Sequence, residues 1–274
     1  MGSCFTENIS AKMINAGFQT MVNPFGIVYN PLSLGKQIER LFDRKAYTSS
    51  DIFSDKTLYH SFSHHSRFSG TNPKLVLENI NRTIREASDF LQKVPTLILT
   101  FGTAFVYRLK ASGEIVSNCH KLPDAVFTHH RAGIPEIVSE WNRLISLLKT
   151  NNPALKIIFT VSPIRHWKNG ANENQLSKAT LLLSIHELVN THQDCYYFPS
   201  YEMMLDDLRD YRFYADDMIH PSPKAIDYIW EKFSETFFDK KTIEAAKNFE
   251  NAKKALNHRP LHPTMEPDVP DELD

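Results

Sequence analysis

The chain of 274 residues contains no apolar run that approaches the roughly 20 residues of a membrane-spanning helix. It also lacks the basic segment followed by an apolar segment that marks a signal peptide. Positive and negative charges nearly cancel, with 31 Lys and Arg residues against 32 Asp and Glu, so no basic surface for nucleic acid or anionic lipid is expected. We therefore expect a cytoplasmic protein that binds neither nucleic acid nor membrane.

Cysteine is also scarce, since only Cys4, Cys119 and Cys195 occur. An odd and sparse count argues against a disulfide framework and fits a reducing compartment. The three lack the C-x-x-C spacing of a structural zinc site, and no H-E-x-x-H motif is present. The sequence therefore predicts neither a metal nor a cofactor.

Histidines gather in one segment, where His60, His64 and His65 lie close together. Without a carboxylate partner at metal-ligand spacing, we expect them to be surface residues. The alternative is a substrate-facing cluster with Arg67 and Arg165.

Three continuous apolar runs have the length of buried strands, at 96–101, 156–161 and 195–198. Such runs are typical of strands buried on both faces of a parallel sheet. Apolar residues at helical spacing, with Pro at several first turns, predict helices between and around them. The predicted helices are 7–16, 31–43, 73–93, 135–149, 175–191, a helix that begins at 222–230, and 241–257. The alternation of strands and helices predicts an α/β layer fold with a mostly parallel sheet.

The remaining segments give weaker signals. Residues 18–22 could form a short strand, whereas 47–71 and 111–134 are expected to be irregular and to shape a pocket. We divide the chain into a domain at 1–238 and a C-terminal helix with a flexible acidic tail at 239–274.

Two short stretches carry candidate chemistry. Near the start, Gly2 precedes two potential nucleophiles, Ser3 and Cys4. A glycine allows a sharp turn into a helix, whose N-terminus lowers the pKa of a thiol and offers N–H groups to an oxyanion. Near the other end, Asp217 and His220 stand three residues apart, so one loop could supply a base and the acid that orients it. Alone, each stretch is more often a helix cap or a turn.

Together with other motifs, these stretches resemble the GSCFA family in order along nearly the whole chain to about residue 238. The resemblance rests on G-S-C-F (2–5), N-P-F-G-I-V-Y-N-P (23–31), H-S-R-F (65–68), F-G-T-A (101–104), N-C-H-K (118–121), S-P-I-R (162–165) and D-x-x-H-P (217–221). That family is assigned to the SGNH/GDSL-type hydrolases. The resemblance therefore implies a three-layer α/β/α, flavodoxin-like fold with a C-terminal helical extension.

The superfamily pattern also implies roles for residues. Asp217 matches its acid and His220 its base. Laying G-D-S over G-S-C puts Cys4 at the nucleophile position, although Ser3 stays an alternative. A thiol would suit acyl transfer through a thioester, and a serine would suit plain ester hydrolysis.

Two departures from the superfamily pattern stand out. Its apolar first strand precedes the glycine, whereas here only Met1 does, so we expect either a truncated start or a sheet without that strand, and a nucleophile on a fraying terminus. Its oxyanion-hole Asn is absent from the block at Gly102. The candidate oxyanion and substrate-binding residues are Gly26, Asn30, Gly102, Asn118, His120 and Arg165.

The leading hypothesis is an esterase or acyltransferase that acts on an O-acyl ester, either of a carbohydrate or of a small polar alcohol. The alternative is a catalytically inactive binding module on the same fold. A third reading is a redox-sensing thiol at Cys4, for which Cys119 or Cys195 would have to approach in space.

Overall fold

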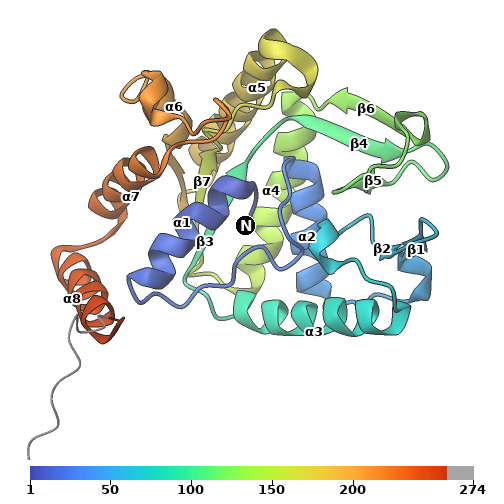
Figure 1. Ribbon diagram of the computed structural model, residues 1–274, viewed down its shortest axis with the longest axis horizontal. Helices are drawn as coiled ribbons and strands as arrows, with labels where there is room; N and C mark the ends of the chain where they lie inside the picture. Colours follow the sequence, from blue (N-terminus) through green and yellow to red (C-terminus); the bar gives the residue numbers. More distant parts are fainter. Residues whose placement is uncertain (258–274) are drawn as a thin grey trace, which may run out of the picture.

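A parallel sheet lies at the centre of the computed structural model, which describes residues 1–257 (Figure 1). Its strands run in the order β3-β7-β8. They are β3 (Thr96–Phe101), β7 (Lys156–Val161) and β8 (Cys195–Phe198). These are the three apolar runs of the sequence, and both pairings are parallel. The predicted mixed α/β fold with a parallel sheet is therefore confirmed, while the tail predicted at 259–274 lies outside the described residues.

Helices pack around this sheet. They are α1 (Cys4–Asn15), α2 (Pro31–Asp43), α3 (Pro73–Leu91), α4 (Ile134–Asn151), α5 (Gly170–Thr191), α6 (Ser200–Leu205), α7 (Pro223–Phe237) and α8 (Lys240–Asn257). Every helix predicted from its spacing forms, and α5 begins earlier than predicted, at Gly170. Asn30, Asn72 and Ser222 accept hydrogen bonds from the first turns of α2, α3 and α7, with Pro at the first or second position of each helix.

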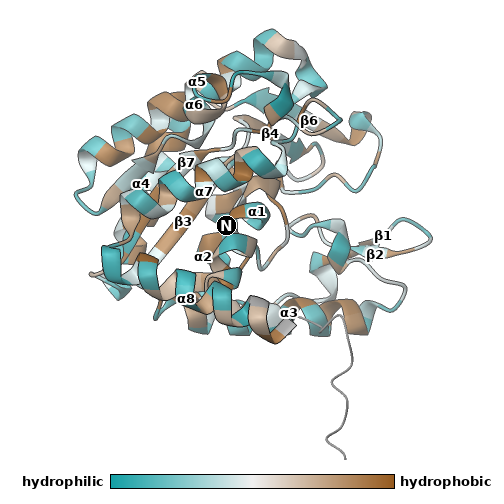
Figure 2. Ribbon diagram, turned by 60° about the vertical axis from the view of Figure 1, so that its left-hand side comes forward, coloured by the Kyte–Doolittle hydropathy of each residue, from teal (hydrophilic) through white to brown (hydrophobic). Residues whose placement is uncertain are grey.

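The two faces of the parallel sheet are buried against different helices. Alternate residues such as Leu99 and Phe159 belong to a core that includes buried side chains of α2 to α5. Their neighbours Ile98 and Ile158 pack in a second core with α1 and α7. Figure 2 shows the sheet strands as predominantly apolar and the helices as mixed in hydropathy. Burial on both faces explains why these strands are continuous apolar runs rather than alternating ones.

Two small antiparallel sheets were not predicted. One has the order β5-β4-β6, with β4 (Phe105–Leu109), β5 (Ile115–Val116) and β6 (Phe127–Arg131). The other pairs β1 (Phe53–Ser54) with β2 (Tyr59–His60). The expectation that 47–71 and 111–134 are irregular was therefore wrong in part. Strand β6 is exposed except for Phe127, so it carries no alternating apolar signal.

The strand predicted at 18–22 does not form. Phe18 instead stacks on Phe238, with ring centroids 4.9 Å apart. These apolar residues are explained by packing against helices rather than by pairing in a sheet.

Within residues 1–257, no helix combines the length and the apolar character that crossing a membrane requires.

Shortening Leu99 to alanine should destabilise the protein by about 2–5 kcal/mol, because the side chain is 0% exposed in the centre of the larger core. Leu75, which is 61% exposed on α3, provides the matched control, and Leu75→Ala should cost less than about 0.5 kcal/mol. Urea unfolding of both variants measures the difference. Equal losses would contradict this description of the core.

Candidate functional site

Residues 1–3 lie beside the end of β3. Gly2 forms a parallel bridge with Thr100, whose N–H donates to the carbonyl of Met1 at 3.0 Å. From the other side, the Gly2 N–H donates to Asn23 Oδ1 at 2.8 Å, and Val28 N–H donates to the Gly2 carbonyl at 3.1 Å. The backbone before Cys4 is therefore held on both sides, contrary to the expected fraying.

Gly2 is required by this close approach. Its φ is +138°, and a Cβ atom there would lie 2.1 Å from the carbonyl oxygen of Thr100. Only glycine fits both the conformation and the space. The turn directs the chain into α1, so that Ser3 is the N-cap residue and Cys4 is the first helical residue.

The two candidate nucleophiles have different surroundings. Ser3 is buried, and its hydroxyl has no hydrogen-bond partner among the described residues. Cys4 is partly exposed, and its Sγ lies 3.6 Å from Nε2 of His220. The structure therefore brings Cys4, and not Ser3, against the candidate base.

The segment Ala215–His220 is closed by its own hydrogen bonds. The N–H of Ala215 donates to the carbonyl of His220 at 2.7 Å, and Tyr214 forms a bridge with Pro221. Asp217 Oδ1 accepts the N–H groups of Ile219 and His220, each at 2.9 Å. Two residues after His220, Ser222 caps α7, which begins at Pro223. The imidazole is thus held at a helix entrance.

Asp217 and Cys4 contact opposite nitrogens of the His220 ring. Its Oδ2 lies 2.6 Å from Nδ1 of His220, while Nε2 of the same ring faces Cys4. The N–H groups of His220 and Ile219, followed by the imidazole, lower the pKa of Asp217 to about 2. Asp217 is therefore ionised at neutral pH and favours the tautomer with a proton on Nδ1. That tautomer leaves Nε2 free to accept a proton from the thiol.

Opposing effects act on the pKa of the Cys4 thiol. Burial raises the pKa of Cys4, and the charge of Glu7 raises it further. The backbone N–H groups of Cys4 and Phe5 at the N-terminus of α1, and the charge of Lys178, lower it. Because burial dominates, the thiol needs a base to become nucleophilic.

The GSCFA family model matches residues 1–233 of this chain. The chain belongs to the GSCFA family. Comparisons with curated proteins and with solved structures found no match. The predicted family membership is thus confirmed, and the match includes every residue of the arrangement described above.

The other site residues predicted for this GSCFA protein lie in tightly bonded turns. The Asn30 side chain caps α2, bonding Ser33 N–H at 2.7 Å and the Ser33 hydroxyl at 3.0 Å. The N–H of Gly26 donates to the carbonyl of Asn23 at 2.7 Å, and that of Gly102 donates to the carbonyl of Tyr29, also at 2.7 Å. The backbone N–H groups of Gly26 and Gly102 are therefore not free for an oxyanion. The N–H groups of Cys4 and Phe5 are better placed for that role.

Asn118 and His120 belong to a second polar region. Asn118 Oδ1 accepts the N–H of His120 at 2.8 Å, and the His120 ring bonds the carbonyl of Ser61 at 2.8 Å. The His120 ring also lies 4.6 Å from that of His60. These contacts join the loop at 118–121 to the segment around β2.

The prediction that these histidines are surface residues is wrong for His60 and His64, whereas His65 is partly exposed. His60 is 5% exposed and His64 is 1% exposed. Burial, followed by the charge of Arg40, lowers the pKa of His64 to about 3, so this ring is neutral. Its Nδ1 lies 3.0 Å from the Ser61 hydroxyl. Neither ring is placed to face a substrate.

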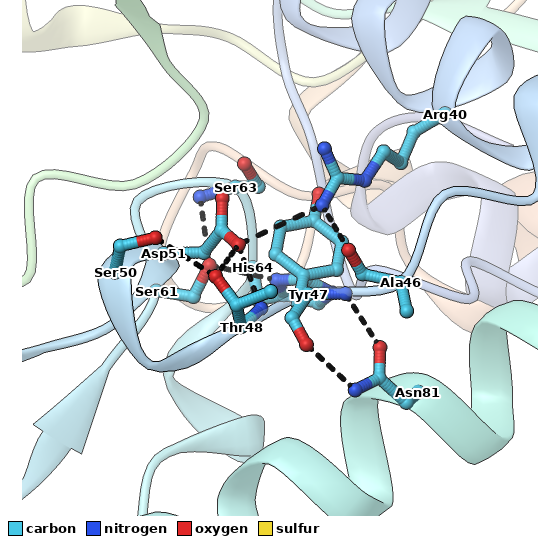
Figure 3. Close-up of polar contacts among 10 residues, drawn as sticks. All are labelled: Arg40, Ala46, Tyr47, Thr48, Ser50, Asp51, Ser61, Ser63, His64 and Asn81. Carbon is cyan, nitrogen blue, oxygen red and sulfur yellow. Dashed lines mark hydrogen bonds and ion pairs between the residues drawn. The ribbon is translucent and has the colours of Figure 1, made fainter.

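Figure 3 shows how the neighbouring residues enclose His64. The guanidinium of Arg40 lies 4.0 Å above the ring of Tyr47 and donates to the carbonyl of Ala46. Asn81 of α3 bonds both the N–H and the carbonyl of Tyr47, at 2.7 and 2.8 Å. These contacts attach the segment after α2 to α3, which is a structural function.

Arg165, predicted to bind substrate, contacts the Asp217–His220 loop. Its Nη1 donates to the carbonyl of Met218 at 3.2 Å, and its guanidinium lies 4.1 Å from the Tyr214 ring centroid. Met218 has a positive φ of 58°, so the loop backbone at this point is one that ordinary residues rarely adopt. Arg165 therefore supports the loop that carries His220.

Sequence reasoning missed Lys178. This residue of α5 is 1% exposed, and its ammonium donates to the carbonyls of Gly102 and Ser162, each at 2.7 Å. The available signal was its position, because Lys178 shares the buried face of α5 with Leu181 and Ile185. A lysine on the apolar face of a helix rarely stays buried without a specific partner.

Gly2→Ala should lower stability by about 2 kcal/mol or more and slow alkylation of Cys4, because the new Cβ collides with Thr100. Gly133→Ala is the matched control, since its Cβ would meet only Pro135 at an ordinary 3.7 Å. Urea unfolding and iodoacetamide labelling measure the two effects. A Gly2→Ala variant that behaves like the control would refute the requirement for glycine at this turn.

Lys178 should also make stability depend on pH. Burial lowers its pKa from 10.5 to about 7, so between these values the unfolded chain holds a proton that the folded chain has released. The free energy of unfolding of wild type, minus that of Lys178→Met, should therefore rise with pH in this window, by at most about 1.4 kcal/mol per pH unit. Below pH 7 the lysine is protonated in both states, and the difference should be constant. Denaturant titrations from pH 6 to 9.5 test this, and a flat difference throughout would contradict it.

Proposed function

We propose that this protein is an esterase or acyltransferase that uses Cys4 as nucleophile, His220 as base and Asp217 as the acid that orients His220. The observation that carries the proposal is the 3.6 Å contact between Cys4 Sγ and His220 Nε2, with Asp217 at 2.6 Å on the far nitrogen of the ring. This is the nucleophile–base–orienter order of acyl-transfer enzymes. The proposal includes a three-layer α/β/α arrangement of the SGNH type.

The proposed reaction has two halves. His220 takes the thiol proton at Nε2, and Cys4 Sγ attacks the acyl carbonyl carbon. The N–H groups of Cys4 and Phe5 receive the oxyanion, since they already face the sulfur. The tetrahedral intermediate collapses, the C–O bond breaks, and His220 returns the proton to the departing alcohol. Water or an acceptor hydroxyl, deprotonated by His220, then cleaves the thioester.

The substrate class we propose is an O-acyl ester of a carbohydrate or small polar alcohol. A cysteine nucleophile fits transfer to an acceptor as well as hydrolysis, because a thioester is more reactive toward nucleophiles than an oxygen ester. Ser3 takes no part in this scheme, since its hydroxyl is buried away from the base.

The test is p-nitrophenyl acetate turnover combined with mass spectrometry of the acetylated protein. Cys4→Ala and His220→Ala should reduce turnover by about 10²–10⁴-fold, and Asp217→Asn should also reduce it strongly. Wild type should carry an acetyl group on Cys4, which should accumulate when the acceptor is scarce.

Ser3→Ala and Cys119→Ala are the matched controls, because they remove a neighbouring hydroxyl and a distant thiol. Both should keep wild-type turnover. Turnover lost in Ser3→Ala but kept in Cys4→Ala would transfer the role of nucleophile to Ser3. A wild-type protein that forms no adduct with acyl probes would instead support a binding module.

A further inference from the structure

The ammonium of Lys178 lies where two strands of the parallel sheet end. Its two acceptors are the carbonyls of Gly102, directly after β3, and Ser162, directly after β7. The neighbouring Ser177 hydroxyl accepts the N–H of Ala104 at 2.7 Å and lies 3.0 Å from the Thr103 hydroxyl. Two successive residues of α5 therefore hold the strand end at 102–104.

Among residues 1–257, this ammonium has no carboxylate partner. None of the ion pairs found within residues 1–257 includes Lys178, and the nearest aromatic ring, that of Tyr201, has its centroid 5.4 Å from Nζ. Carbonyl dipoles only partly replace the water that a buried ammonium loses. An apolar side chain of similar length would avoid this penalty, so the cation needs another explanation.

Gly102 connects Lys178 to the nucleophile. A Cβ atom on Gly102 would lie 3.5 Å from the Cβ of Ser3, so the residue held by Lys178 lies against the residue before Cys4. The electrostatic influence is mutual: the charge of Lys178 lowers the pKa of Cys4, and the Cys4 thiolate raises the pKa of Lys178. Lys178 is thus a buried cation on the strand end that lies against the residue before Cys4.

We propose that Lys178 is a positioning residue that stabilises negative charge at Cys4, in the thiolate and in the oxyanion that follows, through its buried positive charge. Its charge would add to the N–H groups of Cys4 and Phe5 in stabilising the oxyanion. The inference rests on Cys4 being the nucleophile of the proposed function.

Other titratable groups face the same region. Glu7 raises the pKa of Cys4, and Tyr29 is close enough for the Cys4 charge to raise the pKa of its phenol. His220 contacts the sulfur directly, while His166 has its pKa lowered by burial and then by the charge of Lys178. Comparing variants that differ only at Lys178 cancels these shared contributions.

The experiment measures the rate of Cys4 carbamidomethylation by iodoacetamide from pH 5.5 to 9.5, read by peptide mass spectrometry. Lys178→Met should react about three- to tenfold more slowly than wild type below pH 7, where Lys178 is protonated. The ratio should approach one at higher pH, because Lys178 loses its proton above about pH 7. Lys178→Arg should restore most of the rate at low pH.

Ser177→Ala is the control, because it loosens the same strand end without removing charge. It should leave the pH dependence of alkylation unchanged. A Lys178→Met profile equal to that of wild type would overturn the proposal, and so would a slowing that is constant with pH or shared by Ser177→Ala. Acetyl transfer to Cys4 is a separate readout, so either hypothesis can fail while the other stands.

A second measurement covers the case in which Lys178→Met does not fold. NMR titration of wild-type protein labelled with ¹³C at lysine Cε should show one lysine with a midpoint near pH 7. Cys4→Asp should raise that midpoint, since it places a permanent negative charge where the thiolate would form. Titration of every lysine above pH 10, or a midpoint unaffected by Cys4→Asp, would overturn the proposal.

Discussion

The contact between the backbone of Gly2 and the end of β3 is the constraint on which the site depends. The N–H of Ser3 donates to the carbonyl of Thr100 at 3.4 Å, so the first residues follow the parallel direction of the sheet. Because parallel strands end at a common edge, this pairing places Cys4 beside the residues that follow β3 and β7. A side chain at Gly2 would separate the two backbones and displace Cys4.

The site has two kinds of support. Asn23 holds the Gly2 N–H, and Arg67 donates to the Asn23 carbonyl and pairs with Glu7 of α1 at 3.1 Å. On the opposite side, Arg165 holds the loop that carries His220. Elements far apart in the sequence therefore set the distance between the Cys4 sulfur and the His220 imidazole. Local sequence patterns could not predict this distance.

The buried polar residues have two different kinds of surroundings. His60, His64 and His120 pack with aromatic rings and serine hydroxyls in a region that joins loops. Lys178 is different, because it binds the carbonyl of Gly102, next to Ser3, and forms no ion pair within residues 1–257. Burial of an ionisable group is evidence of function only where its field reaches a reacting atom.

The sequence by itself determined much of the secondary structure and the location of the candidate site. Apolar runs determined the strands at 96–101 and 156–161, and prolines after capping residues determined where helices start, because these signals are local. The motifs around Cys4 and His220 indicated the candidate site, but the choice between Ser3 and Cys4 stayed open. Only the tertiary structure decided which of the two faces the imidazole, since their order along a turn does not reveal the direction of each side chain. It also decided the burial of Lys178, whose acceptors are the carbonyls of two distant strand ends.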